Sequence, residues 1–247
     1  MSNPANNNRW LDGGFWGPAL RSSFIPEIEW FVRMFLERVL TAFDNIEAEA
    51  DAAADEAWEG YMQQPSDGSE DPGDYAEIAI EAGIERYTRL SNVRQALLNM
   101  SAVSLWHLVE QQILFFHKRQ VLSIHEENES TLHNRRTFIE RMKAAGIDVE
   151  GLSSWSKLNE LRVIANAVKH GEGNALNQAA LLRPDILIHP TMRDEPPMFQ
   201  SAKPHADRPA GGEDIYVTAA DIKKYAEAAI EFWNKIADEI ERVSVRS

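Results

Sequence analysis

The chain has 247 residues, of which 44% are hydrophobic, so it is long enough to bury a sizeable core. It contains no cysteine, which excludes disulfides, thiolate metal sites and a thiol nucleophile. Its net charge of −14, from 39 acidic and 25 basic residues, argues against a broad nucleic-acid-binding face, although an acidic protein can still cut RNA at a small local site.

Residues 1–24 show no regular pattern, and we expect them to form an irregular N-terminal segment. They contain no basic region followed by an apolar run, so a secretory signal is not expected. No window of about 18 uninterrupted apolar residues occurs in the chain. These observations predict a cytoplasmic protein with no membrane association.

The first helix is predicted over residues 25–60. Pro26 fits the first turn of a helix, and an apolar stripe at helical spacing follows it. The second half of this helix is rich in alanine, aspartate and glutamate, and we interpret that acidic run as a solvated face. Residues 63–74 combine proline, glycine, serine and aspartate, which predicts a linker inside a single helical domain spanning residues 25–247.

A long central helix, or two nearly collinear helices, is predicted over residues 75–124. This segment is apolar around most of its circumference, which is typical of a helix buried at the centre of a bundle. We expect four of its residues to lie in the core: Leu105, Trp106, Val109 and Ile113.

Three polar residues, His107, Glu110 and Gln111, interrupt the predicted central helix. Buried polar groups need partners, so we expect His107 and Glu110 to be buried and paired. One interpretation is that they only satisfy each other, and another is that they orient an arginine or histidine of a neighbouring helix. They could also ligate a metal, but di-metal bundles need such a motif twice and the chain has no second copy, so no metal or cofactor is expected.

Two shorter helices are predicted over residues 132–145 and 154–170. Gly171 follows the second of these helices in the position that favours a left-handed cap. Residues 171–217 include six prolines between positions 184 and 209, which predicts a long loop.

Inside this loop, residues 186–188 and 215–217 could pair as a short ribbon. The last helix is predicted over residues 219–243. Thr218 and Asp221 resemble a capping box at its start, with Asp in place of the usual Glu.

A polar stripe marks the helix over residues 154–170. Arg162, Asn166 and His170 recur every four residues and therefore share one face. Asn166 is a poor residue for a helix interior, so its presence indicates a hydrogen-bonding role. Lys169 and His170 also lie where cations favourably meet the negative end of a helix. The stripe is thus either a reaction site or an ordinary helix end.

The order of these elements, with the run Asn166-Ala-Val-Lys-His170, resembles the HEPN (higher eukaryote and prokaryote nucleotide-binding) superfamily. The resemblance covers residues 25–243, and this run is its only specific motif. It implies an all-α bundle of four or five main helices that forms a homodimer. It also implies metal-independent ribonuclease activity, as in members that act in toxin–antitoxin and phage-defence systems.

The HEPN motif consists of an arginine, four to six residues and a histidine, often with a polar residue directly after the arginine. By this resemblance His170 matches the histidine and Asn166 the polar residue. Ala165 stands at the arginine position, and the nearest arginine, Arg162, has seven residues between it and His170. Arg162 and His170 are then about 12 Å apart along the helix axis. Lys169 is a second candidate for the missing cation.

The resemblance implies RNA as substrate, with His170 as general base or acid and Arg162 or Lys169 stabilising the phosphorane. Asn166 would position the phosphate, and Glu110 and His107 would orient these groups from the central helix. The dimer would form across the faces that carry Asn166 and His170. The alternative is a non-catalytic interaction module, in which the acidic helix and the proline-rich loop bind a partner protein.

Overall fold

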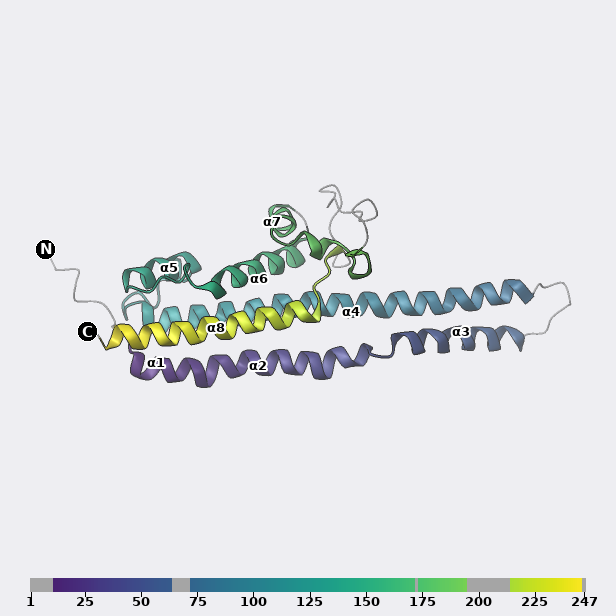
Figure 1. Cartoon of the computed structure of the whole chain (residues 1–247), viewed down its shortest axis with the longest axis horizontal. Coiled ribbons are helices and arrows are strands. Elements are labelled where there is room, and N and C mark those ends of the chain that lie inside the picture. Colours follow the sequence, from purple (N-terminus) through teal and green to yellow (C-terminus); the bar gives the residue numbers. More distant parts are fainter. Residues whose placement is uncertain (1–10, 64–71, 172, 195–213, 246–247) are drawn as a thin grey trace.

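The computed structural model of the chain describes residues 11–63, 72–171, 173–194 and 214–245 (Figure 1). All regular secondary structure in these ranges is helical, which confirms the predicted all-α class. The α-helices are α1 (Gly13–Ala19), α2 (Ile25–Met34), α3 (Ile46–Met62), α4 (Pro72–Phe116), α5 (Arg135–Ala144), α6 (Ser153–His170), α7 (Asn174–Leu182) and α8 (Ala219–Ser244).

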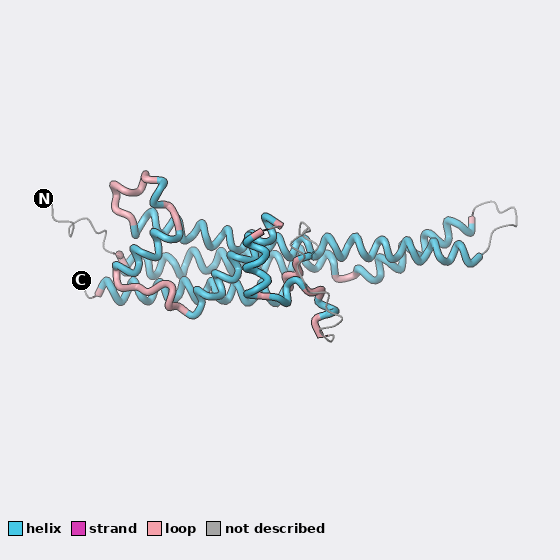
Figure 2. The backbone as a smooth tube through the Cα atoms, turned by 90° about the horizontal axis from the view of Figure 1, so that it is seen from above, coloured by secondary structure: helices cyan, strands magenta, loops and turns pink. Residues whose placement is uncertain are grey.

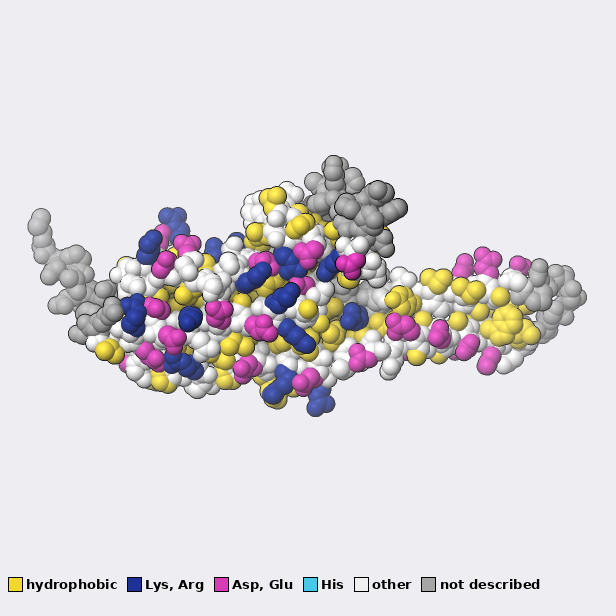
Figure 3. Space-filling model, viewed as in Figure 1, with side chains coloured by type: hydrophobic (Ala, Val, Ile, Leu, Met, Phe, Trp, Pro, Cys, Tyr) yellow, Lys and Arg dark blue, Asp and Glu magenta, His cyan; other side chains and the backbone are white. Residues whose placement is uncertain are grey.

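The molecule has two regions that share α4, a single helix of 45 residues. In the body, the second half of α4 packs against α2, α6 and α8, while α1 packs against α8 and α7 against α6. In the arm, α3 packs against the first half of α4, and the two helices extend beyond the body as an antiparallel pair (Figures 1 and 2). Hydrophobic and acidic side chains lie next to one another along the arm (Figure 3).

The N-terminal segment corrects one expectation, because it is helical from Gly13 onward rather than irregular. A π-helical turn, Leu20–Phe24, joins α1 to α2 without a break. Gly13 and Gly17 are buried against α8, where a Cβ on Gly13 would lie 2.6 Å from the Cα of Glu241. Glycines that resemble helix breakers in the sequence therefore serve close helix packing here.

The second half of α4 is central, as predicted. Leu105, Trp106, Val109 and Ile113 are all at most 2% exposed, so the predicted core face is confirmed. The polar residues that α4 buries are different from those expected. His107 and Gln111 are exposed and Glu110 is half-buried, with no hydrogen bond between His107 and Glu110 among the described residues.

One buried polar group on α4 is Gln112, which links three helices. Its Nε2 donates to the backbone oxygen of Phe24, 3.0 Å away, and its Oε1 accepts from Trp233 Nε1 at 2.8 Å. His107 lies five residues earlier, about 140° away around the helix, on the side that faces solvent. The expectation of a buried His107–Glu110 pair was wrong, because the side of α4 that carries His107 faces solvent, whereas Gln112 is a polar side chain that α4 buries.

The loop over residues 171–217 contains more structure than predicted. Its first part forms α7 and two 3-10 turns, Pro184–Leu187 and Pro190–Met192, while residues 195–213 lie outside the described part. The expected ribbon does not form as strands among the described residues, although Tyr216 N donates to Ile186 O at 2.6 Å. The side chain of Asn99 on α4 completes the pairing of residues 215–217, because it donates to Ile215 O at 2.6 Å and accepts from Val217 N at 3.2 Å.

Arg183, directly after α7, anchors this part of the loop to the body. Its guanidinium lies 2.7 Å from Asp185, 2.9 Å from Asp221 and 3.1 Å from Glu160, and it donates to the Tyr225 hydroxyl at 2.9 Å. Hydrogen bonding by Arg183 holds the pKa of Asp185 below its ordinary value. The network ties the segment after α7 to α6 and α8.

The predicted cap at the end of α6 and the predicted capping box at the start of α8 are both confirmed. Gly171 ends α6 in the left-handed conformation, with φ of 64°, and its N–H donates to Ala167 O at 2.8 Å. The capping box before α8 is formed, since Thr218 Oγ1 accepts from Asp221 N and Asp221 Oδ2 accepts from Thr218 N. No helix in the described ranges is both long enough and apolar enough to cross a membrane.

Candidate functional site

The polar stripe of α6 lies on the open side of that helix. The opposite side packs into the core of the body through residues that include Leu158 and Leu161, both 0% exposed. Arg162 and Asn166 are half-buried, and Lys169 and His170 are exposed. The stripe therefore runs from a half-buried arginine to an exposed histidine at the C-terminal end of the helix.

Ala165 is 0% exposed and points into the core. An arginine at this position would have to bury its guanidinium among apolar side chains, at a high cost in free energy. Arg162, three residues earlier, lies instead on the same face as Asn166 and His170. A cation at position 165 would therefore be costly, and the arginine on the open face of α6 is Arg162.

Two arginines converge on one amide at the N-terminal end of the stripe. Arg162 donates to Asn159 Oδ1 through Nε at 3.1 Å and through Nη2 at 3.0 Å. Arg135, from α5, donates to the same oxygen through Nη1 at 3.4 Å, and its guanidinium lies 5.4 Å from the centre of the Trp155 ring. Within the described ranges, no carboxylate forms an ion pair within 4.0 Å of either arginine.

The surroundings of Arg162 disfavour its charged form. Burial lowers the pKa of Arg162, repulsion by Arg135 lowers it further, and attraction by Glu110 opposes both effects. A bound anion would offset the desolvation of Arg162 and its repulsion by Arg135.

A small cavity of about 200 Å³ lies beside Arg135, and Arg162 is not among the residues that line it. Its polar lining comes from Arg135, Glu110, His133 and Asn134, and its apolar wall from Trp106, Ile113 and Leu114 of α4. Pockets that enclose drug-sized ligands are typically about 300–1,000 Å³, so this one fits a group of the size of a phosphate better than a whole nucleotide.

The predicted site residues are thus only partly brought together. Glu110 lies within electrostatic range of Arg162, whereas His107 is exposed on the neighbouring face of α4. Arg135 and Asn159 were missed by sequence reasoning. Asn159 could have been found because it precedes Arg162 by three residues on the same helical face, but Arg135 comes from a different helix.

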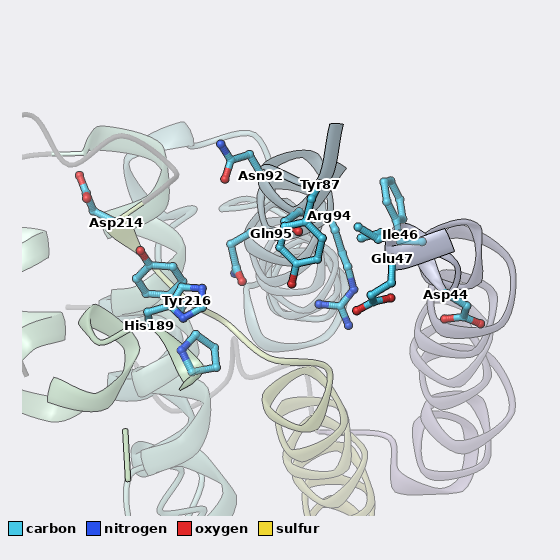
Figure 4. A pocket seen from close by; sticks show the side chains of 13 residues that line it. Asp44, Ile46, Glu47, Tyr87, Asn92, Arg94, Gln95, His189, Asp214 and Tyr216 are labelled. Atoms are coloured by element: carbon cyan, nitrogen blue, oxygen red, sulfur yellow. The ribbon is translucent and has the colours of Figure 1, made fainter. Parts of the chain in front are cut away.

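A larger cavity of about 630 Å³ lies elsewhere, between the base of the arm and the segments around His189 and Tyr216. Figure 4 shows Tyr87 and Arg94 of α4 on one side of it and His189 and Tyr216 on the other. The His189 and Tyr216 rings meet edge to face, with centroids 5.1 Å apart. None of the predicted site residues lines this cavity.

No group of three or more histidine, aspartate or glutamate side chains suited to a metal ion occurs in the part of the chain that the structure describes. Comparisons with protein-family models, with curated proteins and with solved structures find no match for this chain. A function can therefore be assigned only from the geometry of the chain's own residues.

Proposed function

We propose that the chain is a HEPN-like, metal-independent endoribonuclease of a toxin or phage-defence system, and that it acts as a homodimer. The observation that carries this proposal is the pair of guanidinium groups, Arg135 and Arg162, that share Asn159 Oδ1 at one end of a polar stripe that ends at His170. In a chain with a net charge of −14, such a pair without an ion-paired carboxylate favours a local phosphate site.

The two arginines would bind the scissile phosphodiester. Guanidinium groups can donate two parallel hydrogen bonds to phosphate oxygens, and their charge stabilises a phosphorane more strongly than the ground state. Asn166 lies one helical turn beyond Arg162 and would hold a phosphate or ribose oxygen by its amide. Lys169 adds positive charge near the end of α6.

His170 would carry the proton transfer. As general base it removes the proton of the ribose 2′-hydroxyl, and the oxygen then forms a bond to the adjacent phosphorus. The bond between phosphorus and the 5′ oxygen breaks, and a second acid protonates that oxygen. The products are a 2′,3′-cyclic phosphate and a 5′-hydroxyl, and no metal is required.

In a homodimer, the partner subunit's His170 would be the histidine that acts at the phosphate bound by Arg135 and Arg162, and a water molecule would protonate the 5′ oxygen that leaves. Arg162 and His170 are about 12 Å apart along one helix, which is too far for both to contact a single phosphate. The open face of α4 lies beside the α6 stripe, because Glu110 of α4 is within electrostatic range of Arg162. This face exposes apolar and polar residues at a spacing that suits helix pairing: Val93, Met100, Ser104, His107, Gln111 and Phe115.

The test uses the full chain, total RNA as substrate and EDTA in the buffer. The wild-type chain should release 2′,3′-cyclic phosphate ends, and His170→Ala should lower the rate by about 10²–10⁴ while changing stability by less than about 1 kcal/mol. His125→Ala is the matched control, because His125 is also exposed but lies in the turn before α5, outside α6.

The arginine pair has its own control. Arg135→Gln and Arg162→Gln should each weaken RNA binding and slow cleavage, whereas Arg136→Gln on the same helix as Arg135 should not. Arg136 is exposed and pairs with Glu140 at 2.8 Å. Cleavage that EDTA abolishes, or that survives in His170→Ala, would contradict the proposal.

The alternative function is a non-catalytic HEPN-like module that binds a partner protein. The exposed arm favours it, since a pair of helices that leaves large apolar side chains in solvent is typical of an interaction surface. Folded wild-type chain that cleaves no RNA, with or without divalent metal, would favour this alternative over the nuclease.

A further inference from the structure

The arm has an unusual distribution of side chains. It consists of α3 and residues 72–90 of α4, and its buried residues beyond the base are small: Ala50, Ala79 and Gly83. A Cβ added to Gly83 would lie 3.1 Å from Ala50 O and 3.2 Å from the Cβ of Ala54, so the two helices cross closely at this point. At this crossing the contact between the helices is made by small residues, whereas Tyr61 of α3 and Tyr75 of α4 stack nearer the end of the arm, with ring centroids 5.5 Å apart.

The large apolar residues of the arm point outward instead. Ile80 is 60% exposed, Ile84 is 61% exposed and Tyr87 is 45% exposed. Trp58 and Met62 of α3 are also exposed, at 36% and 60%. Side chains of this kind are rarely gathered on the surface of a monomer without a partner.

Three of these residues form one edge of a groove. Ile80, Ile84 and Tyr87 are spaced four and three residues apart and therefore share a face of α4. Ala50, Ala54 and Gly83 form the floor of this open groove, which has a volume of about 320 Å³. A groove with this shape fits the apolar side chains of a third helix packed against the first two.

The charge of the arm decides which helix would fit. The arm carries ten acidic and two basic side chains, which is more than half of the excess of acidic residues in the chain. α3 contributes six of the acidic residues and no basic one, and Asp51 lines the groove itself. Figure 3 shows acidic side chains beside the hydrophobic ones along the arm.

This charge disfavours three other occupants. A nucleic acid and an anionic membrane surface would both be repelled by the acidic side chains. The arm of a second copy would bring like charges together, which costs free energy in an interface. A helix with basic flanks would gain both apolar burial and electrostatic attraction.

We propose that the groove between α3 and α4 is a docking site for an amphipathic helix with basic flanks from a partner protein. The partner would insert apolar side chains at positions i, i+3/i+4 and i+7 between Ile80, Ile84 and Tyr87 and the alanine floor. Its lysines or arginines would lie beside the acidic residues of α3. This site is separate from the α6 stripe, so the proposal does not depend on nuclease activity.

The test measures binding of a labelled 18-residue helical peptide, with leucines at this spacing and lysines elsewhere, to the full-length chain. Saturable binding is expected, and the double variant Ile80→Ser with Ile84→Ser should weaken it by about tenfold or more, because two apolar contacts are lost. Ile78→Ser is the matched control, because Ile78 is exposed on the same helix but does not line the groove.

Two further peptides test separately whether binding requires the apolar spacing and the basic residues of the first peptide. A scrambled leucine–lysine peptide and a peptide with glutamate in place of lysine should both bind at least about tenfold more weakly. Equal binding of all three peptides, an equal loss in Ile78→Ser, or absence of saturable binding would overturn the proposal. Conversion of a dimer to a monomer by the double variant, without peptide, would show that a second copy occupies the groove.

Discussion

The body and the arm share one helix, yet they bury it very differently. In the body, α4 buries large side chains such as Leu105 and Phe116, which are 0% exposed, whereas in the arm it buries only Ala79 and Gly83. The apolar content of α4 does not explain this difference, because Ile80 and Ile84 are as hydrophobic as the buried residues. The number of helices around α4 does explain it, since α2, α6 and α8 pack there in the body, whereas in the described part of the arm α4 packs mainly against α3.

Truncation of a large apolar side chain should have opposite consequences in the two regions. Leu105→Ala should lower the free energy of unfolding by about 2–5 kcal/mol, because it leaves a cavity in a packed core. Ile84→Ala should change it by no more than about 0.5 kcal/mol, since Ile84 is 61% exposed. Urea denaturation of both variants would measure the difference, and equal losses would mean that the arm is packed like the body.

Removal of an arginine should show the same contrast for charged groups. Arg183→Gln should cost about 3 kcal/mol, because it leaves the buried carboxylate of Asp221 without its cation. Arg89→Gln in the arm should cost less than about 1 kcal/mol, since its ion pair with Glu85 is exposed to solvent. A thermal melt of each variant tests this, and a large loss for Arg89→Gln would contradict the comparison.

The pH dependence of stability should depend on the Arg183 network. Arg183 holds the pKa of Asp185 below its ordinary value, so folding gains stability from the ionised carboxylate. This stability is present above the ordinary pKa, near about 4, and is lost as the pH falls through the lower pKa of the folded state. Denaturation midpoints should therefore fall with acidification below about pH 4, and they should fall less steeply in Arg183→Gln.

A smaller pH effect should come from His117, another group of the body. Burial lowers the pKa of His117, and its Nε2 lies 3.0 Å from Leu132 O. The unfolded chain then binds a proton that the folded chain does not, so stability should fall as the pH drops below about 6.5. His117→Gln should remove this part of the slope, and His125→Ala should leave it unchanged.

Signals that act within about one helical turn could be predicted from the sequence. The cap at Gly171 and the capping box of Thr218 with Asp221 depend on neighbours within four residues, and the structure contains both. The core face around Leu105 and Val109 was also predictable, because apolar periodicity reports which side of a helix is buried. The open face of α6 that carries Arg162, Asn166 and His170 follows from the same periodicity.

Contacts between distant segments could not be predicted in this way. Gln112 is buried because Trp233, from α8, donates to it at 2.8 Å, and no local pattern distinguishes it from the exposed Gln111. Arg135 joins Asn159 and Arg162 only because α5 packs beside α6. Gly13 and Gly17 lie in a helix that packs against α8, a contact that no local pattern in residues 1–24 indicates.

By itself, the sequence determined the all-α class, the C-terminal end of α6, the start of α8 and the face of α6 that carries the polar stripe. These features depend on helix geometry and on residues that are neighbours in the chain. Only the tertiary structure decided that His107 is exposed, that two arginines share Asn159, and that the first half of α4 lies in a thin arm. Burial depends on how many other helices pack around a side chain, and those helices come from distant parts of the chain.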